Sequence, residues 1–155
     1  MNQTVELKPD PRWRNFVTNH AALRACADEW PVGQAVPDDI AEVLRVSREL
    51  FVHSYFVYEF LLTAVIWGLL ALEASLRICL EVGDEVSLSK LIRRARSDGL
   101  ITEAEADVLD AGRQLRNSIV HGCLLPTFTP GAAEGMLRGT HEAISDLHGR
   151  AVSKH

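Results

Sequence analysis

The segment from Leu115 to Gly122 brings together three side chains that suit phosphodiester chemistry: Arg116, Asn117 and His121. A guanidinium neutralises a phosphate and donates paired hydrogen bonds to its oxygens. An imidazole changes its charge near neutral pH, and a place in the last turn of a helix favours the protonated form. The segment is therefore the candidate centre of a site that handles a phosphodiester.

Helical geometry separates these side chains. Asn117 and His121 are four positions apart and share one helix face, with Ser118 beside them. Arg116 is rotated by about 100° from Asn117. A single straight helix therefore does not present the guanidinium and the imidazole to one phosphate. Either the helix loosens at Gly122, a residue suited to a left-handed cap, or a second helix closes the site.

Start and stop signals predict the helix that carries this segment and the helix that follows it. Thr102 and Glu105 have the spacing of a capping box, in which the two side chains cap the first turn. Gly122 is expected to end this helix. Pro130 suits the first turn of a last helix that runs to about His148.

Upstream patterns complete an all-α fold, an up-and-down bundle of four to five helices. One helix begins after Pro37, where acidic residues favour a helix start, and a short helix follows Ser87. Between them, residues 58–81 are apolar nearly all round and predict a central core helix. The expected units are an N-terminal arm with one helix (1–36), the bundle (37–150) and a C-terminal tail (151–155).

Two features could serve either internal packing or association. Trp13 and Trp30 bound the helical pattern of the arm, and they either cap the core or dock on a partner or second copy. Gly131, Gly135 and Gly139 recur every four residues in the last helix, where each glycine costs about 0.5–1 kcal/mol relative to alanine. This repeat favours the close approach of another backbone, from the bundle itself or from a dimer mate.

Glu73 lies within the apolar central helix, where a carboxylate is costly unless it is paired. It can form a surface salt bridge with Arg77, four residues further on. It can instead reach across to Arg116 or His121 and support the candidate site. Both arrangements remain open from the sequence.

The short helix after Ser87 carries the one dense basic cluster of the chain. Such a cluster is usually a solvated helix face, but in an acidic chain it is also the natural landing place for polynucleotide phosphates. The candidate RNA-binding residues are Lys90, Arg93, Arg94, Arg96 and, on the following helix, Arg113.

Composition narrows the class of protein. The chain has 155 residues, of which 47% are hydrophobic, and this suits one globular domain. A formal net charge of −5 argues against indiscriminate binding of nucleic acid through a globally basic surface. Three cysteines without C-x-x-C spacing predict neither a disulfide framework nor a zinc site. A cytoplasmic protein is expected.

Metal binding and membrane insertion are not expected. His141 and His148 are seven residues apart and lack a third ligand at close spacing. The apolar run from Phe60 to Leu72 has thirteen residues, fewer than the roughly 18–20 that cross a bilayer. A buried core helix is the better interpretation. Cys123, beside the motif, is expected to be a small buried residue rather than a reactive thiol.

Arg116 followed by Asn117, with His121 followed by Gly122, resembles the signature of HEPN domains. The upstream stretches 72–77 and 99–101 also resemble members of this family, and the resemblance covers roughly residues 40–148. It implies a helical bundle that forms a homodimer, with two Arg/His motifs meeting in one cleft. Such a cleft would bring donors from two helices onto one phosphate.

The resemblance implies a metal-independent endoribonuclease of a toxin or defence system, restrained in some members by a nucleotidyltransferase-type antitoxin. His121 would act as general base or acid, Arg116 would hold the phosphate, and Asn117 would orient either one. Attack by the 2′-hydroxyl would leave a 2′,3′-cyclic phosphate, with no cofactor. The alternative is a non-catalytic adaptor that binds a protein partner or a nucleotide, with Arg116 and His121 in structural roles.

Overall fold

A computed structural model describes residues 7–121 and 129–153, and these residues are helical or irregular, without a strand. The fold is therefore all-α, as predicted. The elements in chain order are a 3-10 helix η1 (Pro11–Trp13) and the α-helices α1 (His20–Asp28), α2 (Asp38–His53), α3 (Phe60–Leu80), α4 (Leu88–Ser97), α5 (Glu103–Val120) and α6 (Pro130–Val152).

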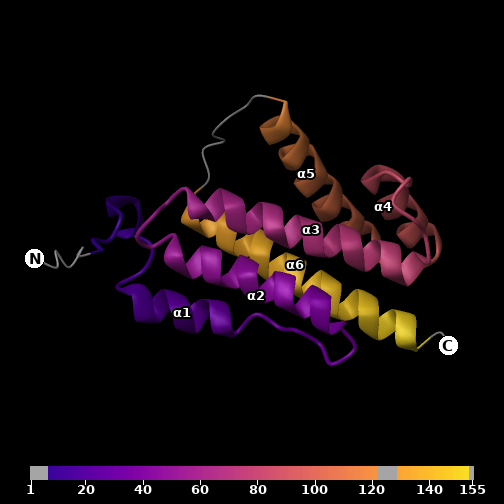
Figure 1. The fold of residues 1–155 in the computed structure, drawn as a ribbon, viewed down its shortest axis with the longest axis horizontal. Coiled ribbons are helices and arrows are strands. Elements are labelled where there is room, and N and C mark those ends of the chain that lie inside the picture. Colours follow the sequence, from indigo (N-terminus) through magenta and orange to yellow (C-terminus); the bar gives the residue numbers. More distant parts are fainter. Residues whose placement is uncertain (1–6, 122–128, 154–155) are drawn as a thin grey trace, which may run out of the picture.

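Helices α2, α3 and α6 pack along their lengths and form the core, with α1 laid against α2 (Figure 1). Their facing side chains are fully buried, among them Leu44 of α2, Leu76 of α3 and Ile144 of α6. Burial of apolar surface of this kind contributes about 25 cal/mol per Å² to folding. The core therefore lies in this bundle, with α3 as its central helix.

The arm packs onto the bundle and closes its end. Trp13 is 1% exposed and its indole Nε1 donates a 2.7 Å hydrogen bond to the carbonyl of Ser54. Trp30 is also buried, with its ring 4.8 Å from that of Phe51. Both tryptophans belong to the chain's own core. One helix was predicted here, but the structure has η1 and α1, because the side chain of Asn19 caps the Ala22 amide at 2.8 Å and starts a new helix.

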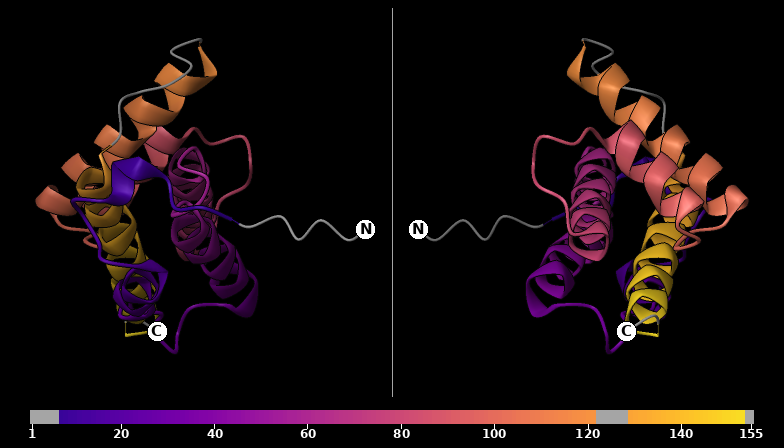
Figure 2. Two further views of the ribbon diagram at one scale, coloured as in Figure 1. Left: turned by 90° about the vertical axis from the view of Figure 1, so that its left-hand side faces the viewer. Right: turned by 90° about the vertical axis from the view of Figure 1, so that its right-hand side faces the viewer.

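Helices α4 and α5 form a hairpin beside the bundle. Gly99 has φ 66°, a left-handed conformation that glycine adopts without strain, and it ends α4. The predicted capping box then starts α5: the Glu105 amide donates to the Thr102 hydroxyl at 3.2 Å, and the Thr102 amide donates to the Glu105 carboxylate at 2.6 Å. Helix α5 contacts α4 and α3, and its C-terminal half points away from the bundle (Figures 1 and 2).

Helix α3 is longer than the apolar run noted in the sequence. Its 21 residues are long and apolar enough to cross a membrane by length and composition, and half of the most apolar window is buried inside the molecule. The core helix of a globular protein meets the same criterion. Helix α6 likewise extends to Val152, two residues beyond the expected end of the bundle. The predicted cap at Gly122 and the position of Cys123 lie outside the described residues.

Candidate functional site

Glu73 holds two arginines at once. Its Oε1 accepts a hydrogen bond from Arg77 Nη2 at 2.7 Å, and its Oε2 accepts one from Arg116 Nη1 at 2.7 Å. The other terminal nitrogen of Arg77 donates to the carbonyl of Gly83 at 2.6 Å. The side chains of Glu73 and Arg77 are 18% and 17% exposed, and that of Arg116 is 35% exposed. The two pairings of Glu73 left open by the sequence thus occur together, and Arg116, not His121, is its partner across the helices.

Gly112 allows α5 to come close enough for this bridge. A Cβ atom at this position would lie 2.7 Å from Cδ2 of Leu69, closer than real contacts allow. Leu69 is one turn before Glu73 on α3, and Gly112 is one turn before Arg116 on α5. A glycine inside a helix otherwise costs stability relative to alanine. Its role is visible only once the two helices are placed together.

The remaining motif residues are exposed. Asn117 and His121 lie at the surface, and His121 is the C-cap residue of α5, with φ −94° and ψ 14°. The amide of His121 donates to the carbonyl of Asn117 at 3.0 Å. Ser118 is occupied within its own helix, donating its hydroxyl to the carbonyl of Gln114 at 3.0 Å. Within one copy of the chain, Arg116 is thus engaged by Glu73, whereas Asn117 and His121 are exposed.

A shallow groove of about 410 Å³ runs between α4 and α5. It brings together three of the predicted RNA-binding residues, which are Arg93, Arg96 and Arg113. Along α5, Arg113, Asn117 and His121 follow each other at four-residue spacing and share a face. The groove therefore leads along α5 toward the exposed half of the motif. Lys90 and Arg94 are exposed on α4 but do not line the groove.

Carboxylates limit the positive charge of this α4–α5 groove. Arg113 Nε lies 2.6 Å from Asp110, and Arg96 Nη1 lies 2.7 Å from Glu103. Asp107 also lines the groove. Within the described part of the chain, Arg93 makes no ion pair or hydrogen bond. A phosphate entering here has one free guanidinium and must compete for the others.

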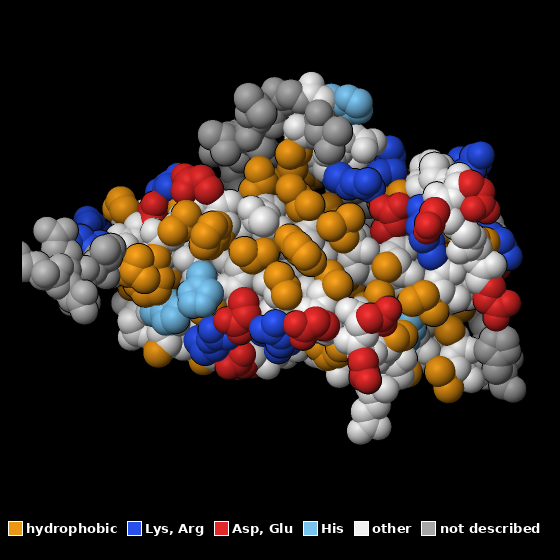
Figure 3. Space-filling view, viewed as in Figure 1, with side chains coloured by type: hydrophobic (Ala, Val, Ile, Leu, Met, Phe, Trp, Pro, Cys, Tyr) orange, Lys and Arg blue, Asp and Glu red, His pale blue; other side chains and the backbone are white. Residues whose placement is uncertain are grey.

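Helix α3 exposes an apolar stripe on the face opposite the core. The stripe consists of Phe60, Trp67, Leu70 and Ile78, which are 36–46% exposed. Apolar side chains gather along this face in the space-filling view (Figure 3). At 100° per residue, Glu73 lies between this stripe and the side of α3 that meets α5. The α3 stripe therefore borders the Glu73–Arg116 pair.

The buried histidines of α6 have structural surroundings. His141 Nδ1 lies 3.2 Å from the carbonyl of Pro31, and burial lowers the pKa of its imidazole from the usual 6.5 to about 4. His148 Nδ1 lies 3.5 Å from Cys79 Sγ, a pair that spacing in the sequence could not reveal. Burial raises the pKa of the Cys79 thiol to about 11, so this pair holds a thiol and not a reactive thiolate. Over the described ranges, no three potential ligands are grouped to hold a metal.

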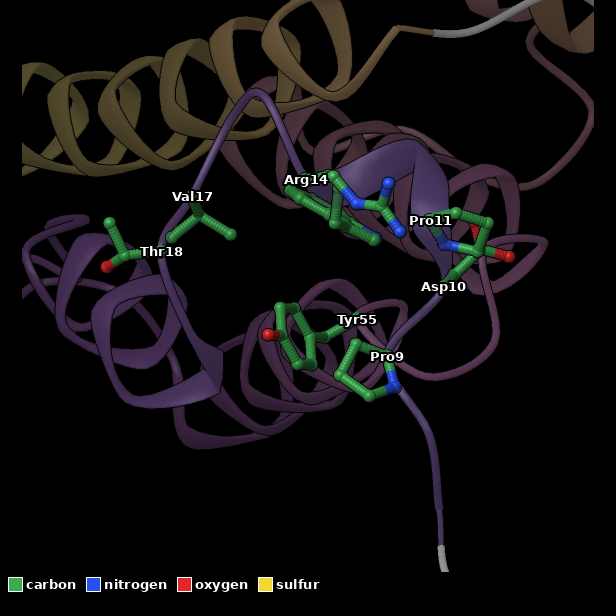
Figure 4. A pocket seen from close by; sticks show the side chains of 8 residues that line it. Pro9, Asp10, Pro11, Arg14, Val17, Thr18 and Tyr55 are labelled. Atoms are coloured by element: carbon green, nitrogen blue, oxygen red, sulfur yellow. The ribbon is translucent and has the colours of Figure 1, made fainter.

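A second hollow, of about 340 Å³, lies between the arm and the end of α2 (Figure 4). Arg14 and Tyr55 line it together with Pro9 and Thr18. Asp10, also in the lining, is engaged by Arg12, which lowers the pKa of its carboxyl. These elements carry none of the motif residues, so this hollow is separate from the candidate site.

Comparison with known proteins adds no relative: no protein-family model, curated protein or solved structure matches the chain.

Proposed function

We propose that the chain is a metal-independent endoribonuclease whose site is completed by a second copy. The observation that carries this proposal is the Glu73 bridge, which holds Arg116 on the α3 side of α5 while His121 and Asn117 face outward. A site that uses both groups on one phosphate needs a second copy of the motif. The HEPN-like spacing of Arg116 and His121 supports the same arrangement.

The apolar α3 stripe supports pairing of two copies. If two α3 helices pair antiparallel about Leu70, the two Glu73 residues lie about 9 Å apart along the helix direction. Paired helices are separated by about 8–10 Å. The two Glu73–Arg116 bridges then lie on either side of the two-fold axis, where one motif can face the other. A symmetric contact of this kind is the commonest form of homodimer.

The proposed chemistry is cleavage of RNA by its own 2′-hydroxyl. His121 takes the 2′-hydroxyl proton while the 2′-oxygen forms a bond to phosphorus, and the bond to the 5′-oxygen breaks as that oxygen gains a proton from the second His121 or from water. Arg116 holds the non-bridging oxygens and stabilises their growing charge. The products are a 2′,3′-cyclic phosphate and a 5′-hydroxyl, and DNA is not a substrate.

The RNA strand would approach along the α4–α5 groove. Arg113 lies eight residues from His121 on α5, or about 12 Å along the helix. Contact at Arg93, Arg96 and Arg113 would therefore hold phosphates neighbouring the scissile one. Because two of these arginines are paired with carboxylates, few phosphates are neutralised, so binding should be weak and should depend only modestly on salt.

The deciding experiment compares His121→Ala with His53→Ala, an exposed histidine of α2 outside the motif. The first variant should abolish cleavage of a mixed RNA pool in EDTA, and the second should keep it. Both should elute at the same size as the wild type. Cleavage that survives His121→Ala in EDTA overturns the assignment. Leu70→Glu should lose both the dimer and the activity, whereas Val152→Glu, at an exposed site on α6, should lose neither.

The exposed position of His121 also favours a second candidate, a non-catalytic adaptor that uses the same motif to bind a protein partner or a nucleotide. A nucleotidyltransferase-type antitoxin is the kind of partner that the HEPN resemblance suggests. Wild-type protein that dimerises but leaves every RNA in the pool intact, and that binds a nucleotide in a His121-dependent way, favours the adaptor.

A further inference from the structure

Helices α5 and α6 diverge from a clamp at one end and leave an apolar groove between them. The clamp is Arg150, whose Nη1 and Nη2 lie 2.9 Å and 3.2 Å from the carboxylate of Glu105. Beyond it the groove has a volume of about 260 Å³. Its floor consists of the apolar or small residues Ala104, Val108, Leu109, Gly139 and Ala143. Val108 is 56% exposed, so the floor is open to solvent.

The glycine repeat of α6 leaves this groove open on one side. Apart from the backbone of α6 itself, no atom of the described residues lies within 4 Å of the place where a Cβ of Gly139 would be, and the same holds for Gly135 one turn earlier. Gly131 differs, because Phe16 lies 3.3 Å away. Glycines inside a helix cost stability. Packing within the described chain does not explain Gly135 and Gly139, so the accessible backbone at Gly139 suits a close-lying external helix.

The rim of this α5–α6 groove is acidic. It consists of Glu105, Glu142 and Asp146, and the lining contains no lysine or arginine. Glu105 is paired with Arg150. Asp146 Oδ2 lies 3.8 Å from Nη2 of the same arginine. Glu142 is exposed and makes no hydrogen bond or ion pair to any residue that the structure describes. One guanidinium thus faces three carboxylates, and the rim attracts cations.

We propose that the α5–α6 groove binds an amphipathic helix of a partner protein, with small or aliphatic residues on one face and lysine or arginine along its flanks. The small face fits against Gly139 and Val108, and the basic flanks meet Glu142 and Asp146. This charge complementarity orients the bound helix and makes its affinity depend on salt concentration. The surface contains neither Arg116 nor His121, so the inference does not depend on ribonuclease activity.

The described chain offers no helix of its own that fits this groove. Helix α4 is basic, but its apolar residues Leu91 and Ala95 are fully buried, and α4 packs on α5 and α3. Helix α1 is apolar on one side, carries a single arginine and lies against α2. The basic helix and the amphipathic arm helix of this chain are thus already packed, and the proposed occupant is a helix of another protein.

The test uses the full chain and a designed, fluorescently labelled helix of alanine, leucine and lysine, with an otherwise identical glutamate peptide as the probe control. The lysine peptide should bind and the glutamate peptide should not. Glu142→Lys with Asp146→Lys should weaken binding by about tenfold or more. Asp28→Lys with Glu29→Lys makes the same change in net charge at the exposed end of α1. This control should change the affinity for the lysine peptide by less than about twofold. Equal losses in the two double variants overturn the proposal.

A second pair of variants separates loss of binding from loss of folding. Gly139→Leu fills the groove, and it should fold well because its Cβ meets open space and leucine favours a helix. Gly149→Leu is the matched control: it is also on α6, its Cβ also meets open space, and it does not line this groove. Binding should be lost only in Gly139→Leu. Retained binding in that variant, or peptide-induced amide shifts that map to the α3 stripe instead of α5 and α6, overturns the proposal.

Discussion

The bundle and the second half of α5 are held by different kinds of contact. Helices α2 and α6 both pack extensively on α3 through buried apolar side chains. The first half of α5 joins the same core through Ala106 and Leu109 and through the clamp at Glu105. Its second half meets the rest of the molecule through the partly buried Leu115 and the bridge from Glu73 to Arg116. Beyond that bridge it carries Asn117 and His121 into solvent. The candidate site residues Asn117 and His121 therefore lie on the part of α5 with the least apolar support.

This difference separates stability from the candidate function. Regions with few buried apolar contacts open at lower free energy than the core does. The second half of α5 can thus open without unfolding the bundle, and its position depends chiefly on the Glu73–Arg116 bridge. Substitutions in the two regions should therefore differ in size and in the observable that they change.

The largest expected effect is in the bundle. Leu44→Ala removes a side chain that is fully buried in α2 and should lower the free energy of unfolding by about 2–5 kcal/mol. Leu115→Ala, at a half-buried position on α5, should cost about 1 kcal/mol. Urea unfolding followed by circular dichroism gives both values. Equal losses would mean that the second half of α5 is as well supported as the bundle.

Acid should also act on the bundle first. His141 is neutral in the folded protein down to about pH 4, whereas its unfolded pKa is 6.5. Between these values the unfolded state binds a proton that the folded state excludes, so stability falls as the pH falls from about 6.5 to about 4. The loss should approach about 3 kcal/mol, at 1.36 kcal/mol per pKa unit. Urea unfolding at several pH values should show this slope in the wild type and a clearly smaller slope in His141→Phe.

Local signals in the sequence predicted where helices begin, but they could not predict contacts between residues that are distant in the sequence. The capping box at Thr102 and the start of α6 at Pro130 depend on neighbouring residues, and both are confirmed. The double pairing of Glu73 depends on a residue 43 positions away. The need for glycine at position 112 likewise depends on a distant residue, because a Cβ there would meet Leu69. Spacing along one helix could show that Arg116 and His121 diverge, but not that Glu73 would hold Arg116.

Glu73→Gln tests the polar support of the second half of α5. An amide cannot serve two guanidinium groups as a carboxylate does, so Arg77 and Arg116 both lose charge pairing in a partly buried place. The expected loss of stability is about 1–2 kcal/mol, between the values for exposed and buried ion pairs. Hydrogen exchange should increase in the second half of α5 more than in α2. Glu42→Gln, at an exposed pair with Arg45, is the control and should leave α5 unchanged.

Thr102→Ala should give the smallest effect, and it tests whether the start of α5 is independent of the bundle. The change removes the hydroxyl that accepts from the Glu105 amide and should cost about 1 kcal/mol. The Arg150 clamp on Glu105 remains, so the first turn of α5 should stay attached to α6 and fray locally. Native-state hydrogen exchange should rise at residues 103–106 and stay unchanged around Leu44. Serine at this position should restore protection, because it keeps the hydroxyl. If the variant instead lowers protection across α2 and α3 by the same amount, the hairpin and the bundle unfold as one unit, and the separation of stability from the candidate function fails.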